Sequence, residues 1–337
     1  MQELKTNEKI YMKLLQQFVE SGDEELLTKV KKLSLTFVNR NVSPGQVVRM
    51  HADALQQIYG DEHDEMVQTF PFLTEALASY RLARVEFERE MDEEEELRSE
   101  IQVAANMQKT LLKTEIPTIE GLEIGAISVP FRQMNGDYYH FVKSDCGVLG
   151  VAIADVIGKG VPAALAMSMI KYAMDSFYEE SMTPNDILRR LNRVVERNVT
   201  PNMFITMLYG QYFPSTSTFR FASAGHEPGF VYKANKKEFV ELKAQGLVLG
   251  VLEDTKYSQY QVTIEHNDMI VLLTDGVTEC RRGERFIKRE ELIDVIDQYA
   301  HLPAQQHVEQ VYKHFSELED FLLKDDFTLI VIKKEVC

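Results

Sequence analysis

The stretch VAIADVIGKG, residues 151–160, decides the fold of the second part of the chain. It is a strongly apolar, strand-like run that carries Asp155 toward its end. Two later apolar runs have the same form: MIVLLTDGVTE carries Asp275, and KDDFTLIVI carries Asp326 directly before its strand. Because strand ends hold side chains rigidly, we expect the three aspartates to meet at one edge of a sheet.

Carboxylates that are brought together without a counter-cation repel one another, so three converging aspartates indicate a divalent-metal site. Hard cations such as Mg²⁺ or Mn²⁺ supply the missing charge. The competing interpretation is turn chemistry, because aspartate after a strand often caps a helix or starts a turn. Gly158 and Gly160 after Asp155, and Gly276 after Asp275, favour the metal site when the three motifs are taken together.

Composition excludes several classes of function. A length of 337 residues predicts about two domains. The formal net charge of -16 argues against binding to nucleic acid or to an anionic membrane surface, since phosphate groups need a clustered basic face. Three cysteines without a C-x-x-C pair argue against disulfides and fit a reducing compartment. With no apolar signal core and no apolar run near ~20 residues, we expect a cytoplasmic protein.

Residues 1–84 have apolar side chains at the three- and four-residue spacing of helices, which predicts four short helices. Ser43 and Pro44 start the third helix and Gly60 ends it, and the fourth is expected to bend at Pro71. Such helices form an antiparallel bundle, which we interpret as a regulatory and partner-binding domain. Its core is modest, so we also expect a homodimer through these helices.

Residues 85–120 are a highly acidic connector, with an unbroken acidic run at 92–96. Such a run is usually the solvated face of a helix. The helical pattern then continues before Pro117 through Leu97, Ile101, Ala104, Ala105, Gln108 and Leu111. The pattern predicts a continuous helical linker, stiff enough to transmit a movement.

The remainder, 121–337, has short β-branched and aromatic runs divided by turn residues. The strand candidates are LEIGAISV, GVLGVAIA, FITMLYGQYF, TFRFASA, GFVYK, QYQVTIE, DMIVLLT and FTLIVIKK. Helical blocks are expected at 161–198 and 288–321. Regular β–α alternation and a G-x-G-x-x-G loop are both missing, which argues against a Rossmann fold. Antiparallel sheets covered by helices fit better.

Five motifs stand in one order along the chain: NGDYYH, ADVIGKGVPAAL, SAGHEP, LLTDGVTE and DDFTLIVI. Over about 121–334 they resemble the PPM (PP2C-like) serine/threonine phosphatases in their bacterial SpoIIE-type branch. With the helical front end, the whole chain resembles a phosphatase of a general stress-response pathway. The resemblance implies an α+β fold, an αββα sandwich of two antiparallel sheets flanked by helices, preceded by an all-α four-helix domain and a helical linker.

The same resemblance assigns a metal site. Asp155 matches the carboxylate that bridges two Mn²⁺ or Mg²⁺ ions, and Val156 offers its backbone carbonyl to one of them. Asp275 and Asp326 match side-chain ligands of the second ion. Two cations about 3.5–4 Å apart would hold phosphate oxygens and lower the pKa of a bound water, so that no protein nucleophile is required.

Asp137 matches an acidic residue that orients the attacking water in this family. The chain departs from the usual G-G-D-F-Y-D pattern around it, with Asn135 and His140. Four residues separate Cys280 from Arg285, one fewer than in the loop of a cysteine phosphatase, which argues against a thiol nucleophile.

Three more residues stand beside these motifs. Lys159 either approaches the substrate or is a solvated lysine, and His226 either has a positional role near the site or is a hydrogen-bonded turn histidine. Gly276 begins the loop 276–286, which is either a flap over the site or an exposed basic loop.

The leading hypothesis is a metal-dependent protein phosphatase that acts on phosphoserine. The resemblance implies a phosphorylated anti-anti-sigma factor of STAS type as substrate, whose dephosphorylation activates a stress-response sigma factor. It also implies a kinase-like switch protein that binds the amino-terminal domain and activates the enzyme. Two alternatives stay open: a non-catalytic adaptor that only binds phosphoprotein, and a metal-dependent hydrolase of small phosphate esters.

Overall fold

The computed structural model describes residues 2–59, 69–157, 161–177, 182–199, 203–282, 285–318, 321–323 and 325–335. The chain forms two compact units, residues 1–100 and residues 101–337. None of the helices in the described ranges combines the length and the apolar content that crossing a membrane requires.

The first unit is helical, as the sequence predicts. Its helices are α1 (Gln2–Ser21), α2 (Glu25–Asn39), α3 (Pro44–Tyr59) and the first part of α4 (Phe70–Leu111). Their core contains fully buried Tyr11, Phe37 and Phe72, with the Tyr11 ring edge-on to Phe72. The expected bend at Pro71 is wrong, because α4 begins at Phe70 and so places Pro71 in its first turn, where proline is tolerated.

The predicted helical linker is confirmed: α4 runs without a break from Phe70 to Leu111. Its acidic part is exposed and carries ion pairs between residues four apart, such as Arg84 with Glu88 at 2.8 Å and Arg89 with Glu93 at 3.2 Å. These pairs lie on the solvated helix surface, where water screens the charges, so each contributes little to stability. The functional division into 1–84, 85–120 and 121–337 stays a prediction.

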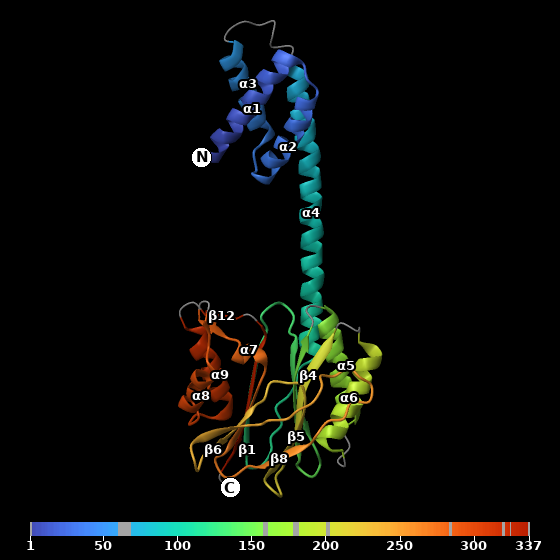
Figure 1. Cartoon of the computed structure of the whole chain (residues 1–337), viewed down its shortest axis with the longest axis vertical. Helices are drawn as coiled ribbons and strands as arrows, with labels where there is room; N and C mark the ends of the chain where they lie inside the picture. The colour runs from blue at the N-terminus through green and yellow to red at the C-terminus, as the bar shows by residue number, and fades with distance from the viewer. Residues whose placement is uncertain are drawn as a thin grey trace. The chain divides into compact units, whose positions relative to one another are not determined.

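The second unit holds two five-stranded antiparallel sheets (Figure 1). The first sheet has the order β1-β13-β9-β6-β7 and the second β2-β3-β4-β5-β8. The strands are β1 (Leu122–Val129), β2 (Asp137–Lys143), β3 (Leu149–Ile157), β4 (Phe204–Phe213), β5 (Thr218–Ala224), β6 (Phe230–Lys233), β7 (Glu238–Glu241), β8 (Tyr260–Thr263), β9 (Met269–Leu273) and β13 (Phe327–Lys334). A small third sheet joins β10 (Arg281–Arg282), β11 (Arg285–Phe286) and β12 (Phe321–Leu322).

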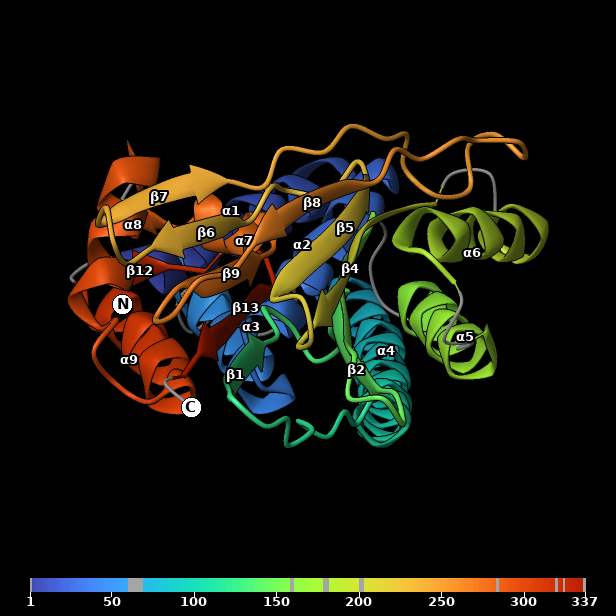
Figure 2. The same cartoon turned by 90° about the horizontal axis from the view of Figure 1, so that it is seen from below.

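Helices cover both outer faces of the two sheets, which confirms the αββα sandwich (Figure 2). The helices are α5 (Val161–Phe177), α6 (Pro184–Asn198), α7 (Asp275–Thr278), α8 (Arg289–Gln298) and α9 (Ala304–Ser316). Helix α9 packs on β1 and β13, whereas α5 and α6 pack on β3, β4 and β5. Three apolar layers result, one between the sheets and one under each helix pair.

The sequence located most strands but not all of them. The eight predicted runs correspond to β1, β3, β4, β5, β6, β8, β9 and β13, whereas β2, β7 and the short strands β10, β11 and β12 were not predicted. The first six residues of β2 are buried or half-buried on both faces, so they lack the polar–apolar alternation by which a strand is recognised. Each predicted helical block is two helices, α5 with α6 and α8 with α9.

Candidate active site

Asp137 and Asp155 lie directly opposite each other on neighbouring strands. Asp137 begins β2 and pairs with Asp155 of β3, which in turn pairs with Thr206 of β4. Since directly opposed residues of an antiparallel pair point to the same face, the two carboxylates share one face of the second sheet. Asp155 lies two residues inside the end of β3 rather than at its end.

Asp326 comes from the other sheet, where it directly precedes β13. Its Oδ1 accepts the backbone N–H of Phe131 at 2.6 Å, and its Oδ2 accepts the N–H of Gly136. Both donors belong to the loop between β1 and β2. The loop therefore holds the carboxylate of Asp326 in one orientation beside the first residue of β2.

Gly136 marks the point at which the predicted ligands converge. A Cβ atom on Gly136 would lie 3.1 Å from Oδ2 of Asp326 and 3.7 Å from both Oδ1 of Asp155 and the carbonyl oxygen of Val156. Two carboxylate oxygens and one carbonyl oxygen are the type of ligand that Mg²⁺ and Mn²⁺ prefer. The residues present therefore fit a hard divalent cation, and they do so where glycine leaves the space open.

Asp275 occupies a different position from the other aspartates. It follows β9 and begins α7, and burial raises the pKa of its carboxyl, with Asp325 and Glu279 as the next contributors. In the described part of the chain, no three Asp, Glu, His or Cys side chains are grouped closely enough to hold a metal ion by themselves. The structure thus brings Asp155, Val156 and Asp326 together, and the role of Asp275 as a ligand stays a prediction.

The electrostatics of the site favour a cation. Burial raises the pKa of Asp137 well above its usual value, and the charges of Asp155 and Asp326 raise it further. Burial also raises the pKa of Asp326, although the N–H groups of Phe131 and Gly136 oppose this. Each carboxylate is therefore less stable as an anion here than in water, and a bound cation would remove that penalty.

Thr274 is a site residue that the sequence analysis did not identify. It is fully buried, its Oγ1 donates to Oδ2 of Asp137 at 2.7 Å, and the same oxygen accepts the N–H of Thr328 at 3.2 Å. The hydroxyl therefore links the end of β9 and the start of β13 to the first residue of β2. In the sequence, only its position next to Asp275 in LLTDG pointed to it.

His226 lies behind Asp155 as a buried neutral imidazole. Its Nδ1 is 2.8 Å from Oγ1 of Thr206, the strand partner of Asp155. Burial lowers the pKa of His226 to about 4. A neutral, buried ring suits the positional role that the sequence left open, and that role stays a prediction.

The two departures from the family pattern have distinct surroundings. His140 is buried, stacks on Tyr138, and pairs through Nε2 with Oδ1 of Asp175 on α5 at 2.8 Å. It therefore joins β2 to the helix that covers it. Asn135 hydrogen-bonds to the backbone N–H of Asp137 at 3.0 Å and thus supports the site directly.

Of the other predicted residues, Lys159 lies outside the described residues. At Gly276 an added Cβ would come within 2.0 Å of the carbonyl oxygen of Asp326, so this glycine lets α7 pack against the chain before β13. In the described part of the loop 276–286, the guanidinium of Arg281 lies 4.0 Å from the centre of the Phe286 ring. Whether the loop acts as a flap stays a prediction.

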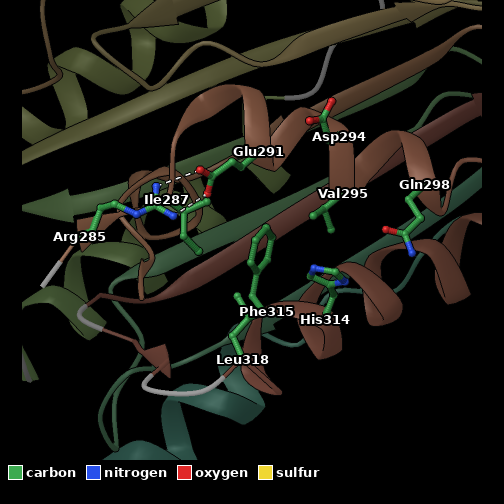
Figure 3. Close-up of a pocket in the computed structure, with 9 residues that line it drawn as sticks. All are labelled: Arg285, Ile287, Glu291, Asp294, Val295, Gln298, His314, Phe315 and Leu318. Atoms are coloured by element: carbon green, nitrogen blue, oxygen red, sulfur yellow. Dashed lines mark hydrogen bonds and ion pairs between the residues drawn. The ribbon is translucent and has the colours of Figure 1, made fainter. Parts of the chain in front are cut away.

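Two pockets differ in their relation to the aspartates. One, of about 510 Å³, lies between the last turns of α4 and the start of β2, and Asp137 and Asn135 line it. The other, of about 330 Å³, lies between α8 and α9 around Phe315, beside the paired Arg285 and Glu291 (Figure 3). None of the site aspartates lines this second pocket, so only the first adjoins the candidate site.

Comparison with known proteins agrees with this arrangement. Residues 145–335 match the family described as Stage II sporulation protein E (SpoIIE), and residues 9–83 match the N-terminal domain of the phosphoserine phosphatase RsbU. The chain is 45% identical to the phosphoserine phosphatase RsbU of Bacillus subtilis over 98% of both chains. It is also 23% identical to the protein IcfG of Synechocystis, over 70% of this chain and 41% of the other.

Solved structures share the fold. The PP2C domain of SiaA from Pseudomonas aeruginosa matches with a TM-score of 0.60 and 18% identity, over 73% of this chain and 98% of that one. A structure of RsbU and RsbW domains from Mycobacterium tuberculosis matches with a TM-score of 0.57 and 21% identity, over 65% and 63%. At such identities the likeness shows the fold alone.

Proposed function

The chain belongs to the SpoIIE family of PP2C-like (PPM) phosphatases, and from that premise we propose that it is a metal-dependent phosphatase of phosphoserine in a protein substrate. The observation that supports this most is the convergence of Asp155, Val156 and Asp326 oxygens around Gly136. Asp137 lies directly beside them, opposite Asp155. A PPM phosphatase requires such a cluster of oxygen ligands, whereas a binding domain has no need of it.

We propose two divalent cations, Mn²⁺ or Mg²⁺, as cofactors. Asp155 and the Val156 carbonyl would hold one, and Asp155, Asp275 and Asp326 the other. When bound, such cations neutralise phosphoryl oxygens and acidify water. Asp137 would orient the attacking water, with its carboxylate fixed by the hydroxyl of Thr274.

A protein nucleophile is not needed in this proposal, and the thiol of Cys280 does not suit that role. Cys280 is buried, and burial raises the pKa of its thiol to about 12. Its Sγ instead donates to the carbonyl oxygen of Gly276 at 3.1 Å. A thiol in this state stays protonated at neutral pH and contributes to packing.

The substrate we propose is a phosphorylated anti-anti-sigma factor of STAS type, whose dephosphorylation releases a stress-response sigma factor. The support is the 45% identity to RsbU over nearly the whole chain, rather than a contact in the structure. The pocket beside Asp137 carries Lys109 and Lys113 on its α4 side, which would favour an anionic phosphoprotein. The substrate would then approach from this side of the sandwich.

The amino-terminal helices we propose as the site of a kinase-like switch protein and of homodimer formation. The match of residues 9–83 to the RsbU N-terminal domain supports this. Because α4 runs unbroken from this region into the second unit, partner binding would change the population of catalytically competent molecules through the linker.

The two alternatives predict different results in one assay. An adaptor would bind phosphoprotein without releasing phosphate, and a small-ester hydrolase would prefer p-nitrophenyl phosphate to phosphoprotein. We would therefore measure kcat/KM for a phosphoserine STAS protein and for p-nitrophenyl phosphate, with Mn²⁺ and with the candidate switch protein present. Our proposal predicts the higher kcat/KM for the phosphoprotein. The reverse order would favour the small-ester hydrolase, and no phosphate release from either would favour the adaptor.

A further inference from the structure

Gln108, in the last turn of α4, makes two hydrogen bonds to a single residue, Asn135, of the loop between β1 and β2, here called the site loop. Its Nε2 donates to the carbonyl oxygen of Asn135 at 2.6 Å, and its Oε1 accepts the N–H of Asn135 at 3.0 Å. The side chain is 5% exposed, so both bonds form away from bulk water. The amide of Gln108 thus fixes the backbone of Asn135 at both of its polar groups, as a neighbouring strand would.

Asn135 passes this constraint on to Asp137. The side chain of Asn135 accepts the backbone N–H of Asp137 at 3.0 Å and donates to Oγ of Ser128 at 2.7 Å. The hydroxyl of Ser128 is in turn 2.9 Å from Oγ1 of Thr328 on β13. With its backbone held by Gln108 and its side chain held by β1 and β2, Asn135 has one position.

The next residue, Gly136, is the point at which the ligand oxygens converge. Its N–H donates to Oδ2 of Asp326, and its carbonyl accepts the N–H of Val156 at 3.1 Å. Any displacement of Asn135 would therefore move Gly136. Through these two bonds it would also change the distance between Asp326 and Val156. A misplacement of about 1 Å in such a site can lower the catalytic rate about a hundredfold.

The end of α4 that carries Gln108 is held in place by other residues of the second unit. Lys171 of α5 donates through Nζ to the carbonyl oxygens of Leu111 at 2.8 Å and Lys113 at 3.2 Å. Ala105 packs with Met134 and Ala164 one turn earlier. Gln108 is therefore presented to the site loop from a helix end that the same unit holds in place.

The plain alternative is that Gln108 is a buried amide that only contributes stability. For a purely structural role, it does not matter which backbone groups the side-chain amide of Gln108 hydrogen-bonds to. Here both bonds go to the residue directly before the convergence point, and they join a chain of bonds that reaches Asp137. We therefore expect the loss of these two bonds to affect the site itself and not only the stability of the fold.

We propose that Gln108 is a positioning residue of the active site: it sets the Asn135–Gly136 backbone, and thereby the metal-ligand oxygens and Asp137, from the end of the linker helix. The inference rests on the proposed function, since it takes the roles of Asp137 and of the ligand oxygens from it. It goes further by giving the linker helix a direct contact with Asn135, the residue that holds the backbone N–H of Asp137 and precedes Gly136.

The test compares Gln108→Met with the control Gln56→Met in the full chain. Methionine keeps the length and helix propensity of glutamine but removes both hydrogen bonds, and Gln56 is an exposed helical glutamine that does not line the pocket beside Asp137. Two quantities are measured: Mn²⁺ affinity, from the signal of free Mn²⁺ in electron paramagnetic resonance, and kcat and KM for p-nitrophenyl phosphate.

For Gln108→Met we expect Mn²⁺ binding about tenfold weaker and kcat about tenfold lower, with little change in the substrate KM at saturating Mn²⁺. Gln56→Met should behave as the wild type. Gln108→Leu, which also removes both hydrogen bonds and favours the helix, gives a second variant and should change both quantities in the same direction.

Wild-type Mn²⁺ affinity and kcat in folded Gln108 variants, with only a lower melting temperature, would show a purely structural role and overturn the inference. Failure of the proposed function would look different. In that case the wild-type chain itself would neither bind Mn²⁺ nor release phosphate.

Discussion

Thr274 and Asp137 join the two sheets at the site: Oγ1 of Thr274 donates to Oδ2 of Asp137 at 2.7 Å, although 137 positions separate the two residues in sequence. Thr274 follows β9 of one sheet, and Asp137 begins β2 of the other. The hydrogen bond favours the ionised carboxylate and so opposes the rise in pKa that burial causes. It keeps Asp137 oriented beside Asp155.

The first prediction concerns this bond. Thr274→Val keeps the shape of the side chain but removes the donor, so Asp137 loses both its orientation and a bond to its charged form. A hydrogen bond to a charged group contributes about 1.5–3 kcal/mol, which corresponds to a loss of about tenfold or more in kcat. Steady-state kinetics with Mn²⁺ would measure it, with Thr263→Val on the exposed strand β8 as control. Equal kcat in both variants would refute the role of Thr274.

The second prediction concerns the space at Gly136. Alanine there would place its Cβ 3.1 Å from Oδ2 of Asp326, so the carboxylate must shift by a few tenths of an ångström. We expect Gly136→Ala to weaken Mn²⁺ binding by about tenfold. The control is Gly45→Ala, where the nearest atom would be Oγ of Ser43 at 3.9 Å. Calorimetric titration that gives wild-type Mn²⁺ affinity for Gly136→Ala would contradict the assigned convergence point.

The third prediction concerns pH and the amino-terminal unit. His51 is buried, its Nδ1 lies 3.0 Å from the hydroxyl of Tyr11, and burial lowers its pKa from 6.5 to about 4. Below pH 6.5 the unfolded chain binds a proton at this residue that the folded chain does not, so its contribution to stability is complete above that pH and decreases as the pH falls toward 4.

Hydrogen exchange of the amides in α1 and α3 tests this window. Protection should fall between about pH 6.5 and about pH 4 after correction for intrinsic exchange, and it should fall less in His51→Gln, which has no proton to gain. The same loss of protection in both proteins would show that His51 does not cause the pH dependence.

The fourth prediction concerns the linker. Replacing Glu93 to Glu96 by glycine and serine should break the helical coupling, because glycine costs about 1 kcal/mol per residue in a helix interior. Replacing the same four residues by glutamine removes the charge but keeps the helix. We expect the first variant to lose stimulation by the switch protein while it keeps basal activity, and the second to keep both. Full stimulation of the glycine–serine variant would rule out transmission through the helix.

The sequence predicted those parts of the fold that depend on local pattern. The helical spacing of 1–84, the unbroken pattern of the linker and runs such as 269–273 and 327–334 are each recognisable within one element. Strand β2 was missed because Tyr138 and Tyr139 point to opposite faces and are buried and half-buried, so its residues do not alternate between polar and apolar. Only its pairing with β3 in the folded chain identifies β2 as a strand.

Within the site, sequence motifs indicated the aspartates but not what holds them. Gln108 was placed on the apolar face of its helix by spacing, yet its partner Asn135 lies 27 positions away and no periodicity relates the two. Thr274 likewise contacts Asp137 only through the meeting of two sheets. Long-range contacts of this kind follow from tertiary packing, which a single sequence does not encode in any local pattern.

The most direct test of the account is release of phosphate from a phosphoserine STAS protein by the full chain, with the switch protein present. Wild type, Asp155→Asn and the exposed control Asp145→Asn would be compared with Mn²⁺ and with the metal removed by chelation. The account predicts activity in the wild type and in Asp145→Asn that requires Mn²⁺, and a loss of at least about a hundredfold in Asp155→Asn. Metal-independent activity, or wild-type activity in Asp155→Asn, would contradict it.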